Sequence, residues 1–459
     1  MSTLGTEALP LRVAVVGSGP TGFFATDALL KSGKSVVVDV YDRLPTPFGL
    51  VRLGVAPDHA KIKTITKTFE KTMNDNASRV SFFGNVTVGR DVTLDELRRA
   101  YDAVLFSSGA ESDRRLGIPG EDLAGSHTAT AFVAWYNGHP DARDLAFDLS
   151  GERAFVVGQG NVAMDVARVL AKSPDELSKT DIASHALEVL AESKIREIHV
   201  IGRRGPAQVK FTPPEVRELG ELTACDVVVD RAALELDPAS QAERETGPDS
   251  IKKIMEILTD YAGRAPRASS TKRLFLRFLE SPTALSGDAR VRGIALEKNR
   301  LVGEPMKLSA EGTGVVVNEA CDILFRSVGY KGRPIPGVPF DDKRGVIPNA
   351  GGRVVVEGAP VAGLYTAGWI KRGPSGVIGT NKPCAVETVA AILDDAASLT
   401  PAKERDSDGV RALLDARKVR AISWSDWKKI DAAEVARGAP LGKPREKLTR
   451  LDDVLAALG

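Results

Sequence analysis

Val13-Ala-Val-Val-Gly17-Ser-Gly19-Pro-Thr-Gly22 is the stretch of sequence that decides the fold. A short apolar strand ends there in glycines spaced G-x-G-x-x-G, and an apolar helix follows at residues 23–30. In such a unit Gly17 makes a tight turn, Gly19 lets a pyrophosphate approach the backbone, and Gly22 lets the helix pack closely on the strand. The free N–H groups at the start of the helix, and its dipole, attract phosphate. The stretch therefore predicts a dinucleotide site.

The residue that ends the next strand indicates which dinucleotide binds at this first loop. A β-branched strand at residues 36–40 leads to Asp42, which lies twenty residues beyond Gly22. An acid at this position accepts hydrogen bonds from a ribose hydroxyl and repels a 2′-phosphate. The first loop therefore predicts FAD or NAD(H) and not NADP(H).

A second glycine loop repeats the plan in Phe155-Val-Val-Gly158-Gln159-Gly160-Asn161-Val162-Ala163, between a strand at 154–157 and a helix at 162–170. The strand at 198–201 then leads to Gly202-Arg203-Arg204, where the first unit has an acid. A helix and loop at 174–194 make the interval longer than the usual spacing of about twenty residues. Because guanidinium groups pair bidentately with phosphate and keep their charge, Arg203 and Arg204 are predicted to bind the 2′-phosphate of NADP(H).

Two different dinucleotides in one chain indicate electron transfer between them. Nicotinamide gives up a hydride as a two-electron unit, whereas a flavin accepts it and releases single electrons. The cysteines Cys225, Cys321 and Cys384 are far apart, without a C-x-x-C pair. We therefore expect no disulfide relay, no thiolate-held cluster and no metal site, so the electrons must leave for a separate molecule.

The composition is that of a globular protein with more than one domain. The chain has 459 residues, of which 43% are hydrophobic and 27% charged, and its length exceeds that of a single hydrophobic core. Lys plus Arg (62) nearly balances Asp plus Glu (61), which argues against general nucleic-acid binding. There is no run of about 18 apolar residues for a membrane span, and residues 1–12 lack a targeting pattern. We expect a cytoplasmic protein.

The order of strands and helices predicts an α/β fold. Further apolar strands at 101–106, 322–325 and 363–367 end in small residues, and apolar strands that alternate with helices are typical of buried parallel sheets. Because the first unit resumes after the second, we predict two Rossmann-like dinucleotide-binding domains, with the NADP domain inserted into the FAD domain. The predicted segments are 1–112 and 326–397 for the FAD domain, 113–325 for the NADP domain, and 398–459 for a C-terminal helical extension with helices at 410–419 and 448–458.

Three longer motifs carry a family resemblance: Pro45-Thr-Pro-Phe-Gly-Leu-Val-Arg52, Gly54-Val-Ala-Pro-Asp-His59 and Trp369-Ile-Lys-Arg-Gly-Pro-Ser-Gly376-Val-Ile-Gly-Thr-Asn381. Most flavin reductases with two dinucleotide domains carry Asp where this chain has Trp369. Over essentially its full length the chain resembles adrenodoxin reductase and its bacterial relatives, the ferredoxin–NADP+ reductases of that type.

The resemblance implies roles for individual residues. Asp42 stands where the family more often has Glu at the flavin ribose. His59 and Glu215 match polar residues beside the flavin and the nicotinamide, where they orient and tune the cofactors and where His59 relays a proton. Flavin contacts are implied for Thr21, Leu50, Val86, Trp369, Gly376, Val377 and Ile378. NADP(H) contacts are implied for Arg114, Gln159, Gly160, Asn161, Val162, Arg203, Arg204, Glu215 and Gly376.

The resemblance also implies the electron acceptor, a ferredoxin or similar small acidic iron–sulfur protein that docks on the NADP domain of a monomeric reductase. Between residues 264 and 277 the chain has five basic residues and no acid, namely Arg264, Arg267, Lys272, Arg273 and Arg277. Such a patch would steer an acidic partner.

The leading hypothesis is an FAD-containing NADPH:ferredoxin oxidoreductase, reversible in principle. One alternative is the NADPH-oxidising subunit of a larger enzyme, similar to the glutamate synthase small subunit. Those proteins carry N-terminal cysteine clusters, whereas no cysteine precedes Cys225 here. The other alternative is a non-catalytic, flavin-bearing redox sensor.

Overall fold

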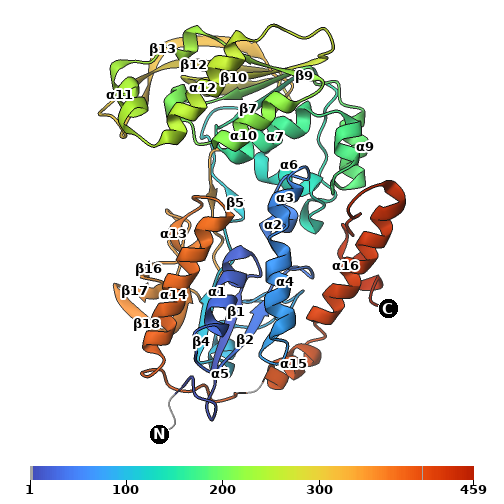
Figure 1. Cartoon of the computed structure of the whole chain (residues 1–459), viewed down its shortest axis with the longest axis vertical. Coiled ribbons are helices and arrows are strands. Elements are labelled where there is room, and N and C mark those ends of the chain that lie inside the picture. The colour runs from blue at the N-terminus through green and yellow to red at the C-terminus, as the bar shows by residue number, and fades with distance from the viewer. Residues whose placement is uncertain (1–3, 406) are drawn as a thin grey trace.

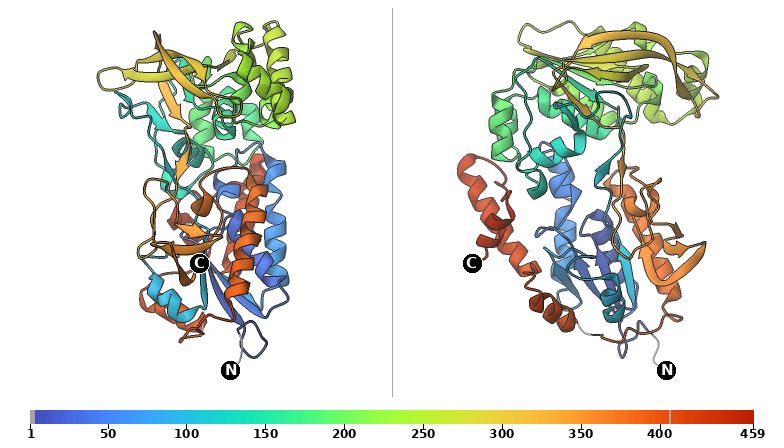
Figure 2. Two further views of the ribbon diagram at one scale, coloured as in Figure 1. Left: turned by 90° about the vertical axis from the view of Figure 1, so that its left-hand side faces the viewer. Right: turned by 180° about the vertical axis from the view of Figure 1, so that it is seen from behind.

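The structure is a computed structural model that describes residues 4–405 and 407–459. Residues 1–3 and 406, which belong to the predicted segments 1–112 and 398–459, lie outside the described residues. The chain forms two bodies, one above the other in Figure 1, and its C-terminal helices lie beside the lower body and reach up to the upper one. Figure 2 shows the same arrangement from the side and from behind.

The first body is built on a seven-stranded sheet in the order β16-β17-β18-β4-β1-β2-β3. The five strands from β18 to β3 are parallel, while β17 and β16 are antiparallel additions at one edge. The strands are β1 (Leu11–Val16), β2 (Val36–Tyr41), β3 (Val80–Phe83), β4 (Ala103–Phe106), β16 (Asn349–Ala350), β17 (Arg353–Val356) and β18 (Ala359–Thr366). The helices are α1 (Pro20–Leu30), α2 (Leu50–Leu53), α3 (Ala60–Lys63), α4 (Thr66–Asp75), α5 (Leu94–Ala100), α13 (Trp369–Arg372) and α14 (Asn381–Asp395).

The second body is built on a six-stranded parallel sheet in the order β6-β14-β7-β8-β10-β9. A three-stranded antiparallel sheet, β11-β12-β13, lies in the chain between β10 and β14. The strands are β6 (Ser126–Thr128), β7 (Arg153–Val157), β8 (Glu197–Ile201), β9 (Cys225–Val229), β10 (Lys272–Arg277), β11 (Glu280–Ser286), β12 (Gly293–Val302), β13 (Ser309–Ala320) and β14 (Ile323–Arg326). The helices are α6 (Ala129–Tyr136), α7 (Asn161–Ala171), α8 (Pro174–Ser178), α9 (Ser184–Ala191), α10 (Pro213–Glu218), α11 (Pro238–Thr246) and α12 (Asp249–Gly263).

The chain passes from the first body to the second and back through two strands that pair with each other. β5 (Ser112–Asp113) and β15 (Tyr330–Lys331) form an antiparallel pair. The predicted α/β fold, with one parallel-sheet domain inserted into another, is therefore confirmed.

The C-terminal region is helical as predicted, but its helices differ from the predicted ones. They are α15 (Ser407–Ala416), α16 (Trp424–Gly438) and α17 (Leu451–Ala456), and α16 was not predicted. Trp427 and Ile430 of α16 are buried in the core of the first body, and the Trp427 ring packs edge-on against Phe48 at 5.7 Å. Beyond α16 the chain reaches the second body, where Lys443 donates a hydrogen bond to the carbonyl of Ile182 at 2.6 Å. The region thus joins the two bodies.

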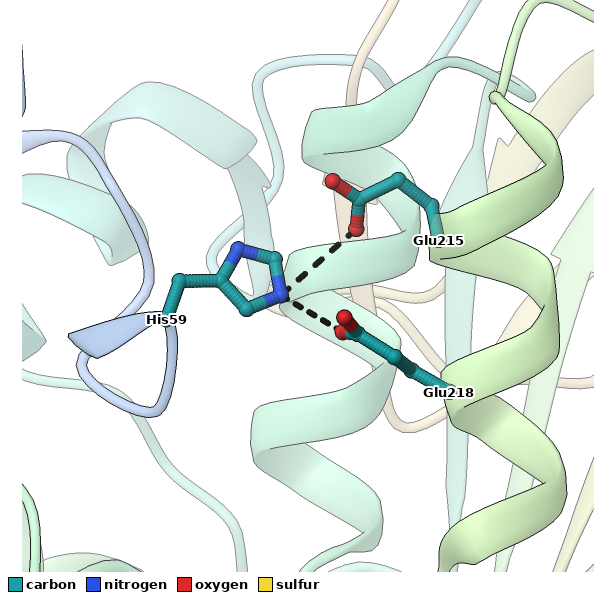
Figure 3. A group of neighbouring side chains, drawn as sticks. All are labelled: His59, Glu215 and Glu218. Atoms are coloured by element: carbon teal, nitrogen blue, oxygen red, sulfur yellow. Dashed lines mark hydrogen bonds and ion pairs between the residues drawn. The ribbon is translucent and has the colours of Figure 1, made fainter. Parts of the chain in front are cut away.

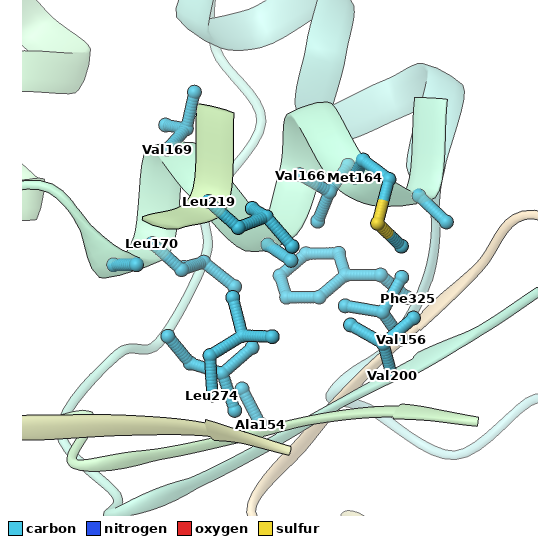
Figure 4. Close-up of a cluster of buried hydrophobic side chains, with 14 of the residues drawn as sticks. Ala154, Val156, Met164, Val166, Val169, Leu170, Val200, Leu219, Leu274 and Phe325 are labelled. Carbon is cyan, nitrogen blue, oxygen red and sulfur yellow. The ribbon is translucent and has the colours of Figure 1, made fainter. Parts of the chain in front are cut away.

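The core of the second body lies between its parallel sheet and the helices α7 and α10 (Figure 4). Val156, Val200, Leu274 and Phe325 of four neighbouring strands are fully buried. Helix α7 packs over them, and its residues from Ala163 to Ala171 are all buried. This packing holds the loop between β7 and α7 in place.

In the part of the chain that the structure describes, none of the helices has the length and apolar character needed to cross a bilayer.

Replacing Leu274 tests this core. Leu274 is fully buried on a strand with neighbours on both sides. Leu274→Ala should lower the free energy of unfolding by about 2–5 kcal/mol, since it removes methyl groups and leaves a cavity. Urea denaturation followed by circular dichroism measures the change. Leu145→Ala, at a side chain that is 43% exposed, is the control and should change it by less than about 0.5 kcal/mol.

Candidate functional site

The first glycine loop lies where the strand order reverses, between β1 and β4. This reversal point is where open α/β sheets bind their ligands. Gly17 has a φ of 111°, which favours glycine, and a Cβ on Gly22 would overlap the carbonyl oxygen of Gly17. A Cβ on Gly19, in contrast, would meet no protein atom within 4 Å. Helix α1 starts at this loop without a side-chain cap, so its N–H groups are available to a pyrophosphate.

Asp42 is held against this loop at the end of β2. Its carboxylate accepts hydrogen bonds from the backbone N–H of Ser18 at 2.9 Å, from the Ser18 hydroxyl at 2.5 Å and from the N–H of Leu44 at 2.9 Å. The predicted ribose-binding acid therefore lies beside the predicted pyrophosphate loop.

The other predicted flavin residues surround the same loop. A Cβ on Gly368 would overlap the side chain of Thr21. The loop that follows β18 therefore packs against the first glycine loop. Trp369 follows and donates its ring N–H to the carbonyl of Ser375 at 3.1 Å, next to Gly376, Val377 and Ile378. Leu50 is 47% exposed, whereas Val86 is buried and its N–H donates to the carbonyl of Asp42 at 2.9 Å. Their contacts with a flavin stay predictions.

The second glycine loop repeats this geometry between β7 and α7. Gly158 has a φ of 127°, and Gly160 faces open space. The Gln159 side chain donates to the carbonyl of Arg277 at 2.7 Å, and Asn161 accepts from the N–H of Thr212 at 2.9 Å. Helix α7, which continues through Val162, also starts without a side-chain cap. The loop is thus a second open cradle of backbone N–H groups.

Arg203 and Arg204 lie at the end of β8, next to this cradle. A Cβ on the preceding Gly202 would overlap Gln159, and the carbonyl of Arg203 accepts from the Asn299 side chain at 2.9 Å. Arg203 is exposed, and burial together with the charge of Arg203 lowers the pKa of Arg204. Among the described ion pairs neither guanidinium takes part, so two positive charges are available for a phosphate.

Arg114 lies just beyond β5. Its N–H donates to the carbonyl of Gly329 at 3.0 Å, and its side chain is exposed. It therefore lies at the crossing between the two bodies.

His59 and Glu215 come together across the two bodies (Figure 3). His59 precedes α3 in the first body, and Glu215 belongs to α10 in the second. The nearest carboxylate to His59 is that of Glu218, which was not predicted. His59 Nε2 lies 2.7 Å from Glu218 Oε2 and 3.7 Å from Glu215 Oε2, and its Nδ1 lies 3.9 Å from Asp165. Glu218 follows Glu215 by three residues, which places both on one helix face, and this spacing was the signal in the sequence.

Burial and neighbouring charges shift the titration of this group. Burial raises the pKa of Glu215 to about 7, and the charge of Asp165 acts in the same direction. Burial opposes a charged His59, but the hydrogen bond with Glu218 and the charges of Asp165 and Glu215 together outweigh it, so the pKa of His59 is raised. The same bond to His59 is the main reason why the pKa of Glu218 is lowered. The group can therefore hold a proton near neutral pH.

The predicted basic patch at residues 264–277 is not a free positive surface, and that interpretation was wrong. Arg264 pairs with Asp260, Arg267 with Asp226, and Arg273 with Glu197. Arg277 pairs with both Glu280 and Glu319, and Lys272 donates to the carbonyl of Leu170. Asp260 and Glu280 lie just outside the window of 264–277, and the other acids lie on distant strands, so the window alone did not reveal them.

The fold and the two cradles define a class, that of oxidoreductases with two dinucleotide-binding domains. A family model described as pyridine nucleotide-disulphide oxidoreductase matches residues 11–205. The chain is 46% identical over 458 residues to the NADPH-ferredoxin reductase FprA of Mycobacterium tuberculosis, with 97% of this chain and 98% of that protein covered. It is 45% identical over 461 residues to the mitochondrial NADPH:adrenodoxin oxidoreductase of Bos taurus, with 98% and 92% covered.

A solved structure, that of Mycobacterium tuberculosis FprA in complex with NADPH, matches with a TM-score of 0.92 over 98% of this chain and 100% of that one. The chain belongs to the family of NADPH-ferredoxin reductases and NADPH:adrenodoxin oxidoreductases. It is an oxidoreductase that uses FAD and NADP(H), so the predicted family, enzyme class and cofactors are confirmed.

Alanine at the open glycines tests the two cradles. Gly19→Ala should lower the FAD affinity, and Gly160→Ala the NADPH affinity, by at least about tenfold, because the added methyl group occupies space that only a ligand uses. Flavin absorbance per chain and NADPH titration measure the two affinities. Neither change should lower the melting temperature of the flavin-free protein, since both positions face open space. A melting temperature that falls without any loss of ligand would contradict the assignment.

The pKa of Glu215 predicts a pH-dependent stability. Because the folded pKa is about 7, against an ordinary value of 4.5, the stability that this group contributes is full below pH 4.5 and is lost as the pH rises through about 7. Glu215→Gln cannot ionise, so its melting temperature relative to the unchanged protein should rise between about pH 5 and about pH 8. Glu188→Gln, at an exposed position, is the control. A constant difference in melting temperature would contradict the prediction.

Proposed function

We propose that the chain is an NADPH:ferredoxin oxidoreductase, reversible in principle, in which the first loop binds FAD and the second binds NADP(H). The observation that carries this proposal is the pair of open glycine cradles with opposite charges at the ends of the following strands, Asp42 in one and Arg203 with Arg204 in the other. An acid suits a free ribose hydroxyl, and two arginines suit a 2′-phosphate. When both cofactors are bound, nicotinamide supplies a hydride and the flavin converts it into single electrons.

The protein's own residues position the reaction. The N–H groups at the starts of α1 and α7 bind the pyrophosphates, and Asp42 and the two arginines orient the adenosine ends. His59, Glu215 and Glu218 lie between the two bodies, where burial keeps water from most of their surface. Hydride transfer requires no proton, so these residues orient the rings, and His59 with its carboxylate partners holds the proton that accompanies electron release.

The electron acceptor in this proposal is a small acidic iron–sulfur protein. The relatives are named for ferredoxin and adrenodoxin, and each cysteine of the described residues is buried without a disulfide. In place of the paired residues 264–277, we propose that Lys61, Lys210 and Arg217 attract the partner. All three are exposed: Lys61 lies on α3 close to His59 in the chain, Arg217 lies on α10 next to Glu218, and Lys210 lies just before α10. Charges of this kind raise the association rate at low salt.

The remaining assignments are parts of the same proposal. Segments 1–112 and 326–397 form the FAD domain, 113–325 the NADP domain, and 398–459 its helical extension. The paired strands β5 and β15, at residues 112–113 and 330–331, support boundaries at these places. We further propose that the protein is a monomer in the cytoplasm. A flavin that stays oxidised with excess NADPH would favour the alternative of a redox sensor.

Replacing both arginines tests the cofactor preference. Arg203→Ala with Arg204→Ala should raise the KM for NADPH about 10- to 100-fold, because each charge-assisted hydrogen bond lost is worth about 1.5–3 kcal/mol. The KM for NADH, which lacks the 2′-phosphate, should change little. Steady-state reduction of ferricyanide with either cofactor measures both constants.

Arg292→Ala changes an exposed arginine of the same body and is the matched control, with no expected effect on either constant. Equal losses with NADPH and NADH in the double variant would show that these arginines do not bind the 2′-phosphate.

A further inference from the structure

Arg168 is a buried guanidinium that contacts both bodies of the protein. It belongs to α7 and is 1% exposed. Its Nε and Nη2 donate to the two carboxylate oxygens of Asp58 at 2.7 and 3.1 Å. Nη2 also donates to Asp165 at 2.7 Å, and Nη1 donates to Glu215 at 3.4 Å. Asp58 comes from the first body, and Asp165 and Glu215 come from the second.

The charges around Arg168 explain why this contact depends on both bodies. A buried guanidinium is stable only when it is paired, because its desolvation is costly. Burial raises the pKa of Asp165 and raises that of Glu215 to about 7. Burial would also raise the pKa of Asp58, but the hydrogen bonds and charge of Arg168 lower it to about 2. Asp58, which the first body contributes, is the carboxylate that Arg168 contacts through both of its oxygens.

Arg168 and its partners lie next to His59, to Glu218 and to the second glycine loop. Asp58 directly precedes His59, Glu215 lies on α10 with Glu218, and α7 itself begins at the second glycine loop. The other ionisable groups that face this cluster are Lys172, whose Nζ lies 3.5 Å from Asp58, and Tyr136, whose buried hydroxyl has no hydrogen-bond partner among the described residues.

We propose that Arg168 is a positioning residue for hydride transfer: it binds the loop that carries His59 and the helix that carries Glu215, and so sets the distance between the two cofactor sites. This proposal rests on the function proposed above. The fork of the guanidinium is essential to it, because two directions of donation are needed to reach Asp58 and the second body together. Lysine keeps the charge but offers a single donor centre.

Arg168→Lys tests this positioning. At saturating NADPH, the rate constant of flavin reduction in a stopped-flow experiment should fall about 100-fold, the effect expected when reacting groups move by about 1 Å. FAD content and the NADPH dissociation constant should change little, since neither glycine loop nor the arginine pair is altered. Asp58→Asn should give a similar loss, and combining the two changes should add little to it, because both remove one contact.

Arg353→Lys is the matched control. Arg353 also makes a two-pronged pair, with Asp395 at 2.8 and 2.9 Å, but both residues belong to the first body. This variant should reduce its flavin at the unchanged rate. A folded, flavin-loaded Arg168→Lys protein that also does so would overturn the proposal.

Hydrogen exchange tests the positioning role of Arg168 without relying on catalysis. Its result therefore stands even if the proposed function fails. In the FAD-loaded protein without NADPH, Arg168→Lys should speed amide exchange in both 50–63 and 213–218, the segments on either side of the contact. Arg168→Met is a second variant, with the same expected result, should the lysine variant not fold. If the unchanged protein is not reduced by NADPH, the proposed function fails, while the exchange result still tests the contact. Exchange that is unchanged in both segments would overturn the positioning role.

Discussion

Arg168 carries a full positive charge in the interior of the protein, where burial removes the hydration of its guanidinium. Its guanidinium has carboxylates from Asp58, Asp165 and Glu215 within hydrogen-bonding distance, and Glu218 at 3.7 Å. Separating the two bodies would remove Asp58, which accepts two hydrogen bonds from Arg168, and leave only the carboxylates of the second body as its partners, which is unfavourable. The requirement to pair one buried charge therefore constrains how the two domains face each other.

The same constraint relates the two glycine loops to one another. The two loops follow β1 and β7, and each opens a helix without a side-chain cap. Neither loop alone determines where the reactive ring of its own ligand lies relative to the reactive ring of the other ligand. The contacts of His59 with α10, and of Arg168 with the loop before α3, align the two cradles across the gap between domains. The C-terminal segment adds a second link, since Lys443 and Lys447 contact the loop before α9.

The arginines show that a basic stretch of sequence does not by itself predict a positively charged surface. Residues 264–277 are basic without an internal acid, yet Asp226, Glu197 and Glu319 pair with three of the arginines from other strands. Arg203 and Arg204 have no such partner among the described ion pairs. The sequence does not distinguish the arginines that form ion pairs from those that form none. Only the fold decides which charges remain available, because a charge is neutralised by its neighbours in space.

The sequence by itself determined the elements that local geometry dictates. Gly17, Gly22 and Gly158 are required by backbone turns and close packing, so the two dinucleotide loops, their strands and the inserted arrangement could be predicted. Asp42 followed from its distance along the chain to the first loop, and Arg203 and Arg204 followed from their place at the end of the strand after the second loop. His59 and Glu215 came from a family resemblance, Glu218 was indicated only by its spacing from Glu215, and no local rule pointed to Asp58 or Arg168. These residues meet from segments up to 160 residues apart, and the C-terminal helix α16 is fixed by Trp427 packing against Phe48. Such contacts are decided by tertiary structure alone, because burial and pairing exist only after distant segments have packed together.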